Sequence, residues 1–231
     1  MKWEISKDDA FPVLKFDLKK GETVKSQGGS MMAMSEALSL KGKVDGGIGK
    51  AIGRMFSGET FFIQHIEAEE KAGWVLLASA MPGGITDIDI KEGSGITVQK
   101  SGFLAGTPDI DVSTKVQGLI KGIFGGEGLF VVKIGGSGTA FLQTYGAVHM
   151  IEVKAGEEVV VDNGYLIAWD SEMEYEITKG ASSWVSAFTT GSGFVCKFKG
   201  PGRIWTQTRS PTGLASWLIQ YLPKPSKKSS D

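Results

Sequence analysis

The sequence holds few of the residues from which catalytic and metal sites are usually built. It has one cysteine, Cys196, and two histidines, His65 and His149, in 231 residues. A single cysteine excludes an intramolecular disulfide and a thiolate cluster. Its apolar neighbours favour a small buried side chain over a reactive thiol. The histidines are far apart and have no second ligand at a suitable spacing, so no metal site is predicted.

Strong net charge and long apolar runs are also missing. A net charge of −1 provides no overall field that would concentrate a polyanion. Lysine and arginine do not alternate with aromatic residues, so no nucleic-acid partner is expected. No apolar run reaches the roughly 18 residues of a membrane span, and the first residues do not read as a signal peptide. These features predict a cytoplasmic protein.

The glycine-rich segments of the chain do not complete a catalytic motif. Gly136-Ser-Gly138 and Gly191-Ser-Gly193 lack the pattern of a nucleophile elbow. Lys50 follows a glycine as in a phosphate loop, but Ala51 stands where that loop needs Ser or Thr. We therefore predict no catalytic residue and no cofactor, and the sequence favours a protein that is not an enzyme.

Glycine itself is abundant, at 33 residues, and three glycines anchor a pattern that occurs three times. Gly21, Gly93 and Gly156 each follow apolar residues at −5 and −3 and precede one at +3. Each also precedes an apolar pair and an alanine, at +10 to +12: Met31-Met32-Ala33, Phe103-Leu104-Ala105 and Leu166-Ile167-Ala168. The alternation predicts strands joined at a glycine turn, and the alanine predicts a crowded place between two layers.

A second set of strand-like segments begins at Gly73, Gly138 and Gly202, so each unit holds at least four strands. Such a unit cannot bury its apolar face alone. We predict one all-β domain over residues 1–222, with three repeats at about 15–80, 87–146 and 150–210 around one continuous core. Helical spacing of apolar residues predicts a short helix over 212–222, and 223–231 is predicted to be a flexible tail.

Two further segments carry a family resemblance: Arg54-Met-Phe-Ser-Gly58-Glu59 and Gly202-Arg-Ile-Trp-Thr-Gln207-Thr208-Arg209. Together with the repeats, they resemble the altered-inheritance-of-mitochondria protein 24 family over roughly residues 1–211. The resemblance implies a wrapped β-sandwich or double-stranded β-helix, similar to the tryptophan RNA-binding attenuation protein. It implies no enzymatic activity, and its fungal mitochondrial member is associated with inner-membrane organisation. RNA and tryptophan binding are not carried over, because no residues here match that site.

Two glycine-rich inserts, 42–58 and 115–128, interrupt the repeats and place apolar residues at helical spacing near basic ones. They either fold back to close an open end of the β structure or contact another subunit, a lipid surface or another partner. Arg54 or Arg209 is expected to bind a carboxylate, such as Glu59, or strand carbonyls at a repeat junction. The candidate binding residues are Lys50, Arg54, Glu59, Lys121, Gln207 and Arg209.

These features favour a non-enzymatic binding or scaffold protein. We expect a homo-oligomer, with a trimer as the first choice because the relative in fold forms rings. A peripheral membrane or protein partner is a further expectation. The alternative is a small-molecule-binding protein or an enzyme that uses a pocket in the β barrel.

Overall fold

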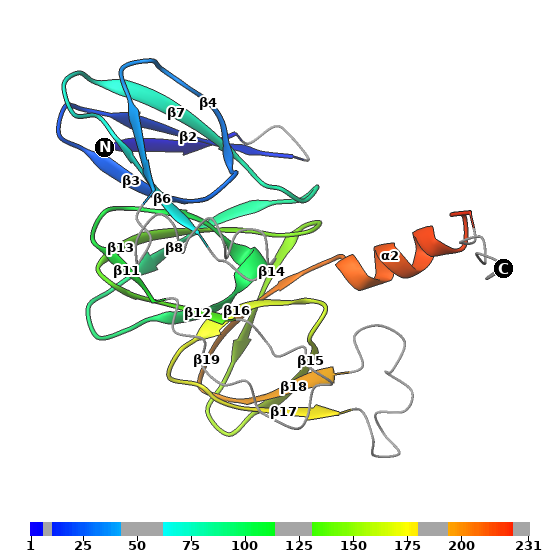
Figure 1. Ribbon diagram of the computed structural model, residues 1–231. Helices are drawn as coiled ribbons and strands as arrows, with labels where there is room; N and C mark the ends of the chain where they lie inside the picture. Colours follow the sequence, from blue (N-terminus) through cyan, green and yellow to red (C-terminus); the bar gives the residue numbers. More distant parts are fainter. Residues whose placement is uncertain (7–10, 43–61, 114–130, 180–193, 224–231) are drawn as a thin grey trace, which may run out of the picture.

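The computed structural model describes residues 1–6, 11–42, 62–113, 131–179 and 194–223, and it is built almost wholly of antiparallel strands. The strands form four sheets, which we number 1 to 4 along the chain and which follow one another as layers (Figure 1). The helix α2 extends away from the layers near the C-terminus. The predicted all-β class and the terminal helix are confirmed.

The outer sheets are the smaller ones. Sheet 1 has four strands, in the order β1 (Lys2–Ile5), β2 (Val13–Leu18), β7 (Gly73–Ala78) and β4 (Met31–Met34). Sheet 4 has three, in the order β15 (Glu158–Asp162), β18 (Phe194–Lys199) and β17 (Glu174–Lys179).

The inner sheets have six strands each. Sheet 2 has the order β5 (Ser39–Gly42), β6 (Ile63–Glu67), β3 (Thr23–Gln27), β10 (Phe103–Gly106), β13 (Gly138–Gln143) and β8 (Ile85–Ile90). Sheet 3 has the order β11 (Ile110–Ser113), β12 (Val131–Gly136), β9 (Ile96–Gln99), β16 (Leu166–Asp170), β19 (Gly202–Gln207) and β14 (Val148–Val153). Within the described ranges, the helices are the 3₁₀ turn η1 (Lys100–Gly102) and α2 (Pro211–Ile219).

Sheets 2 and 3 have the same strand order, displaced by six strands along the chain. In each, three strands from one segment of sequence meet three from the next, through β3–β10 in sheet 2 and β9–β16 in sheet 3. The register is also the same, since Ala105 faces Ser26 and Ala168 faces Val98. Counted from the nearest anchor glycine, both pairs join position +12 to position +5.

The anchor glycines form three matching turns. Gly21, Gly93 and Gly156 have φ of 83°, 80° and 83°. In each turn, the residue after the glycine donates its N–H to the carbonyl of the residue two positions before the glycine, at 2.9–3.0 Å. A glycine with positive φ at the third position of a hydrogen-bonded turn is typical of type II. The predicted role of these glycines is thus confirmed.

The apolar pair and the alanine mark a β-bulge in each segment. The pairing register shifts between Met31 and Ala33, between Phe103 and Ala105, and between Leu166 and Ala168. A bulge inserts one extra residue and turns neighbouring side chains to unexpected faces. Leu104 and Ala105 accordingly enter the same core although they are adjacent in sequence, and so do Ile167 and Ala168. Ala105 and Ala168 are fully buried, as the crowded position predicted.

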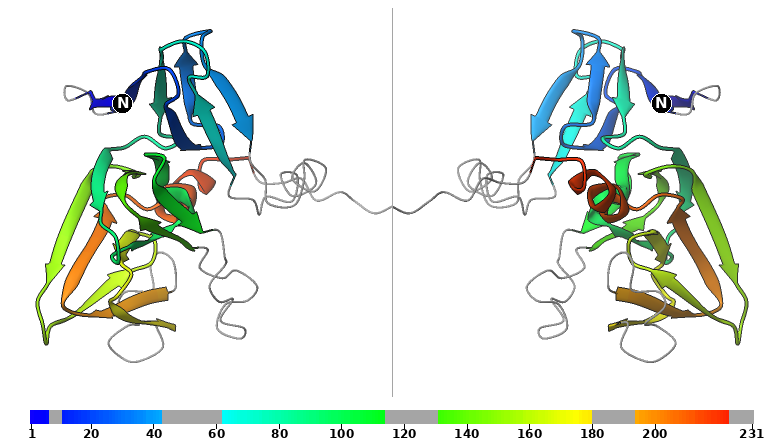
Figure 2. Two further views of the ribbon diagram at one scale, coloured as in Figure 1. Left: turned by 90° about the vertical axis from the view of Figure 1, so that its left-hand side faces the viewer. Right: turned by 90° about the vertical axis from the view of Figure 1, so that its right-hand side faces the viewer.

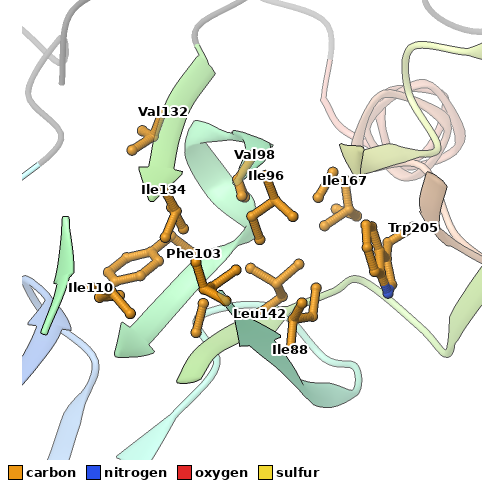
Figure 3. Packing of buried hydrophobic residues seen from close by; sticks show 13 residues of the cluster. Ile88, Ile96, Val98, Phe103, Ile110, Val132, Ile134, Leu142, Ile167 and Trp205 are labelled. Carbon is orange, nitrogen blue, oxygen red and sulfur yellow. The ribbon is translucent and has the colours of Figure 1, made fainter. Parts of the chain in front are cut away.

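The expected single continuous core is wrong, because the buried apolar residues divide into three clusters. One lies between sheets 1 and 2, one between sheets 2 and 3 (Figure 3), and one between sheets 3 and 4. The physical reason is that sheets 2 and 3 each bury both faces, so each sheet separates one core from the next.

Candidate functional site

Three connecting segments run side by side, two where the chain passes between sheets and one where it enters α2. The first follows β7, the second follows β13 and the third follows β19. Gly83 and Gly146 form a parallel bridge, and the Gly146 N–H donates to the Pro82 carbonyl at 2.9 Å. The Thr208 N–H donates to the Ala147 carbonyl at 3.0 Å and so adds the third segment. A Cβ on Gly83 would lie 1.8 Å from the Thr144 carbonyl oxygen, so the approach of the first two segments requires glycine there.

Gln143 and Thr144 hold the first connecting segment in place. The Gln143 Oε1 accepts from the Ala80 N–H at 3.3 Å, and its Nε2 lies 2.6 Å from Gln27 Oε1 and 3.0 Å from the Ser101 carbonyl. Thr144 Oγ1 accepts from the Gly84 N–H at 3.2 Å. Both side chains are buried, so these bonds satisfy polar groups that water does not reach.

Gln207 and Thr208 do the same for the second segment. Gln207 Oε1 accepts from the Tyr145 N–H, and its Nε2 donates to the Gly164 carbonyl, each at 2.9 Å. Thr208 Oγ1 accepts from the Ala147 N–H at 2.9 Å. Gln207, a predicted binding residue, therefore bonds to the backbone of the junction. Gln143 was missed, although the repeated dipeptide Gln-Thr, 64 residues apart, was a signal for it.

A surface groove of about 1160 Å³ lies beside this junction. Its walls come from β1, from the connecting segments and from the beginnings of β8 and β14, and include Trp3, Phe11, Pro82, Tyr145, Val148 and Arg209. Trp3 also packs edge-to-face on Phe141, at 5.7 Å between ring centroids. Most of its lining residues are apolar, and Glu4, Asp87 and Arg209 add charged groups, so this surface could hold a segment of another molecule.

The structure separates the predicted binding residues into two groups. Gln207 and Arg209 lie together at the junction, and the Arg209 N–H donates to the Tyr145 carbonyl at 3.2 Å. Lys50, Arg54, Glu59 and Lys121 lie outside the described residues, as do almost all of both inserts. The contact expected for the side chain of Arg54 or Arg209, with a carboxylate or with strand carbonyls, stays a prediction.

The two histidines and the cysteine lie in separate places. His65 is in β6 of sheet 2 and His149 in β14 of sheet 3. In the part of the chain that the structure describes, no three His, Cys, Asp or Glu residues gather as a metal site would require. Cys196 is buried in the core between sheets 3 and 4, as predicted, and burial, with a smaller effect of Asp162, raises the pKa of its thiol to about 12.

The helix α2 begins at the junction, and only its Leu214 is half-buried. Ser210 is its N-cap, accepting from the Gly213 N–H at 3.3 Å, and Pro211 takes the first helical position. None of its residues is buried, and Trp217 is 54% exposed. Trp217 and Tyr221 form an edge-to-face pair at 5.2 Å. Among the described residues, no helix is long and apolar enough to cross a membrane.

Stacked antiparallel sheets, glycine-anchored turns and a Gln-Thr junction define an all-β protein of a recognisable family. The model of the family described as "Mitochondrial biogenesis AIM24" matches residues 3–209, and the chain belongs to this family. It is 32% identical to an uncharacterised protein of Streptococcus pyogenes serotype M6, over 96% of this chain and 92% of that one. It also resembles a crystal structure of a Streptococcus pyogenes protein, with a TM-score of 0.79 and 29% identity, over 96% of this chain and 99% of that one.

Proposed function

We propose that this chain is a non-enzymatic scaffold protein that acts as a homo-oligomer and attaches to the surface of a lipid membrane through α2. The observation that carries the proposal is the exposure of α2. This helix is anchored firmly at its first residue but leaves Trp217, Leu218 and Ile219 exposed by 54%, 41% and 67%. A short helix with so little buried surface among the described residues gains its stability from packing on something else.

The distribution of residues around α2 fits a lipid surface. At about 100° per residue, Leu214, Ala215, Trp217, Leu218 and Ile219 cover an arc of roughly 200°. Thr212 and Ser216 lie on the remaining side, and no residue from Pro211 to Leu222 is charged. A groove on a protein usually covers a narrower stripe of a helix, whereas a bilayer surface accepts about half of its circumference.

Aromatic residues and nearby lysines support the same partner. Trp217 and Tyr221 combine an apolar ring with a polar tip, which suits the level of the lipid headgroups. The sequence after the helix contains Lys224, Lys227 and Lys228, which would favour anionic lipid. A homo-oligomer would bring several copies of α2 to one surface and so raise the avidity of a weak individual contact.

The membrane contact is tested by flotation of the full chain with phosphatidylcholine vesicles, with and without phosphatidylserine. We expect binding to the anionic vesicles, weakened by salt. Trp217→Ala should reduce binding by roughly tenfold, since about 60 Å² of lost apolar burial corresponds to about 1.5 kcal/mol. Trp74→Ala, which changes a tryptophan that is 39% exposed in sheet 1, is the control and should bind normally. Equal binding by all three proteins would reject the role of α2.

The oligomer is tested separately by sedimentation velocity over a range of protein concentrations. We expect an oligomer, with a trimer as the first choice, and a monomer at every concentration would reject this part of the proposal.

A second candidate is a small-molecule-binding protein, and the groove is the observation that favours it. Its volume of about 1160 Å³ is slightly above the usual range for ligand sites, roughly 300–1000 Å³. Tyr145 and Arg209 would provide aromatic and cationic contacts within it. Mass spectrometry of the natively purified protein should then detect one compound in a fixed ratio, and Arg209→Ala should lose it. Finding no bound compound would reject this second candidate, and the scaffold proposal would remain.

A further inference from the structure

From the strand order, we infer that two copies of this chain associate through their outer sheets. Sheet 4 of one copy and sheet 1 of a second copy would join edge to edge and form one continuous sheet. The inner sheets provide the pattern. In sheet 2, β5-β6-β3 meets β10-β13-β8, and in sheet 3, β11-β12-β9 meets β16-β19-β14. Continued by six strands in either direction, the same pattern makes β17-β18-β15 meet β4-β7-β2. These are the three strands of sheet 4 and three of the four strands of sheet 1, to which β1 is added beside β2.

The two strands that would meet are edge strands in the described part of the chain. There, β4 pairs with β7 alone and β15 pairs with β18 alone. Their counterparts β10 and β16, and β3 and β9, each have a neighbour on both sides. An unpaired edge offers a row of backbone donors and acceptors to another strand. Sheets 1 and 4 lie at opposite ends of the layers (Figure 1), and Figure 2 shows the same separation from the sides. A second copy is therefore the natural partner.

Side chains at the seams point to the same occupant. The core between sheets 1 and 2 includes three residues from the following repeat, Leu104, Ala105 and Phe141. The core between sheets 2 and 3 includes Ile167, Ala168 and Trp205. These two sets occupy matching positions in the repeat. The first two residues of each set lie at +11 and +12 from the anchor glycine, and the third lies three residues after Gly138 or Gly202. We call each set a joining triad, because it inserts into the core of the preceding repeat.

The joining triad of the first repeat belongs to none of the three cores formed by the described residues. By the same positions it consists of Met32, Ala33 and Leu76. Met32 is 54% exposed, whereas its counterparts Leu104 and Ile167 are 0% and 2% exposed. At the other end, the core between sheets 3 and 4 contains no triad from a following repeat. The triad of one copy, in which Met32 is exposed and Ala33 and Leu76 are half-buried, and the core at the other end of a second copy are therefore complementary.

The seams also fix the register of the contact. Position +12 faces +5 and position +13 faces +4 in both inner sheets, as in Ala168 with Val98 and Trp169 with Thr97. Between copies this register places Ala33 opposite Val161 and Met34 opposite Val160. Val160 is 60% exposed in this chain and would become part of the seam. Such a head-to-tail contact closes into a ring when the rotation between copies permits it.

The inference rests on the proposed self-association and adds its location, which cysteine pairs can test in the full chain. Directly opposed residues in an antiparallel pair have Cα atoms about 4.5–5.5 Å apart, within the range of a disulfide. Oxidation of the double variant Met34→Cys, Val160→Cys should give covalently joined copies. The double variant Met34→Cys, Glu158→Cys is out of register by two residues and should give few. The native Cys196 is buried and does not interfere.

A second measurement uses two methionines of similar exposure. Met32→Asp places a carboxylate in the seam and should weaken association by at least about tenfold. Met150→Asp changes a methionine that is 47% exposed in β14 and should associate normally. Unchanged sedimentation of Met32→Asp, with no cross-linking of the in-register pair, would overturn the inference while leaving an oligomeric scaffold intact. A wild-type chain that stays monomeric would overturn both.

Discussion

Met32 and Leu104 occupy the same position of the repeat but have different surroundings. Each is the extra residue of a β-bulge, eleven positions after its anchor glycine. Leu104 lies in an inner sheet and is fully buried, whereas Met32 lies in an outer sheet and is 54% exposed. The difference teaches that the repeated pattern specifies strand, turn and bulge, while the place of the sheet among the layers determines burial. The same substitution should therefore have unequal effects along the chain.

The largest expected effect is the contrast between these two positions. Leu104→Ala removes a fully buried side chain, and we expect a loss of about 3 kcal/mol, or a decrease in Tm of roughly 10 °C. Met32→Ala, measured under conditions in which the chain is monomeric, should change the free energy of unfolding by less than about 0.5 kcal/mol. Thermal denaturation followed by circular dichroism measures both. Equal losses would mean that the outer position is also buried, and the comparison would fail.

A second contrast concerns the two junction glutamines. The Gln143 side chain accepts a hydrogen bond from the backbone of residue 80, and its Nε2 lies within hydrogen-bond distance of three oxygen atoms. The Gln207 side chain accepts one hydrogen bond through Oε1 and donates one through Nε2. Gln143→Ala leaves more buried groups unpaired, so we expect a loss of about 2–3 kcal/mol, against about 1–2 kcal/mol for Gln207→Ala.

Gln220→Ala is the control for both junction variants. Gln220 is exposed at the end of α2 and donates to the Trp217 carbonyl at 2.9 Å. Its replacement should have no measurable effect in urea titration. A loss for Gln207→Ala that exceeds the loss for Gln143→Ala would show that the second junction supports the stack more than the first.

The anchor glycines should behave alike in outer and inner sheets, because their effect is local. Gly93→Ala forces a side chain into a positive-φ turn with no steric contact within 4 Å, and we expect a loss of about 1 kcal/mol. Gly21→Ala and Gly156→Ala should lose the same amount. Gly135→Ala is the matched control, since that position is also open but has no positive φ, and it should be neutral or slightly stabilising. Unequal losses at the three anchors would contradict a purely local effect.

Particular residues show how far the sequence predicts this molecule. The turns at Gly21, Gly93 and Gly156, the all-β class and the terminal helix followed from local periodicity and turn chemistry, which act within a few residues. The separation into three cores did not follow, because it depends on which strands pair across the β3–β10 and β9–β16 seams. Gln207 was selected through a family resemblance, and only the structure showed that its amide bonds the backbone at a junction. The exposure of α2 also required the structure, since apolar spacing predicts a helix but not what its apolar residues contact.

The smallest expected effect on stability concerns Cys196, which lies on the inner face of sheet 4. If an outer sheet differs from an inner sheet only on its outer face, this inner face must exclude water as fully as the inner sheets do. Burial, followed by Asp162, raises the pKa of the Cys196 thiol to about 12. The folded state therefore favours the protonated thiol. This contribution to stability is complete below the ordinary thiol pKa of about 8.5 and is lost as the pH rises towards 12.

Between pH 7 and 8 the thiol should thus leave stability unchanged and react with a disulfide reagent at least about a thousandfold more slowly than a free cysteine, because only the thiolate attacks. The absorbance released by Ellman's reagent measures this rate, and the protein unfolded in urea is the control, in which one thiol per chain should react fully. A fast reaction in the folded protein would mean that the core between sheets 3 and 4 opens readily. The outer sheet would then differ from the inner sheets on both of its faces, and the comparison would have to be drawn between an open end and a closed middle.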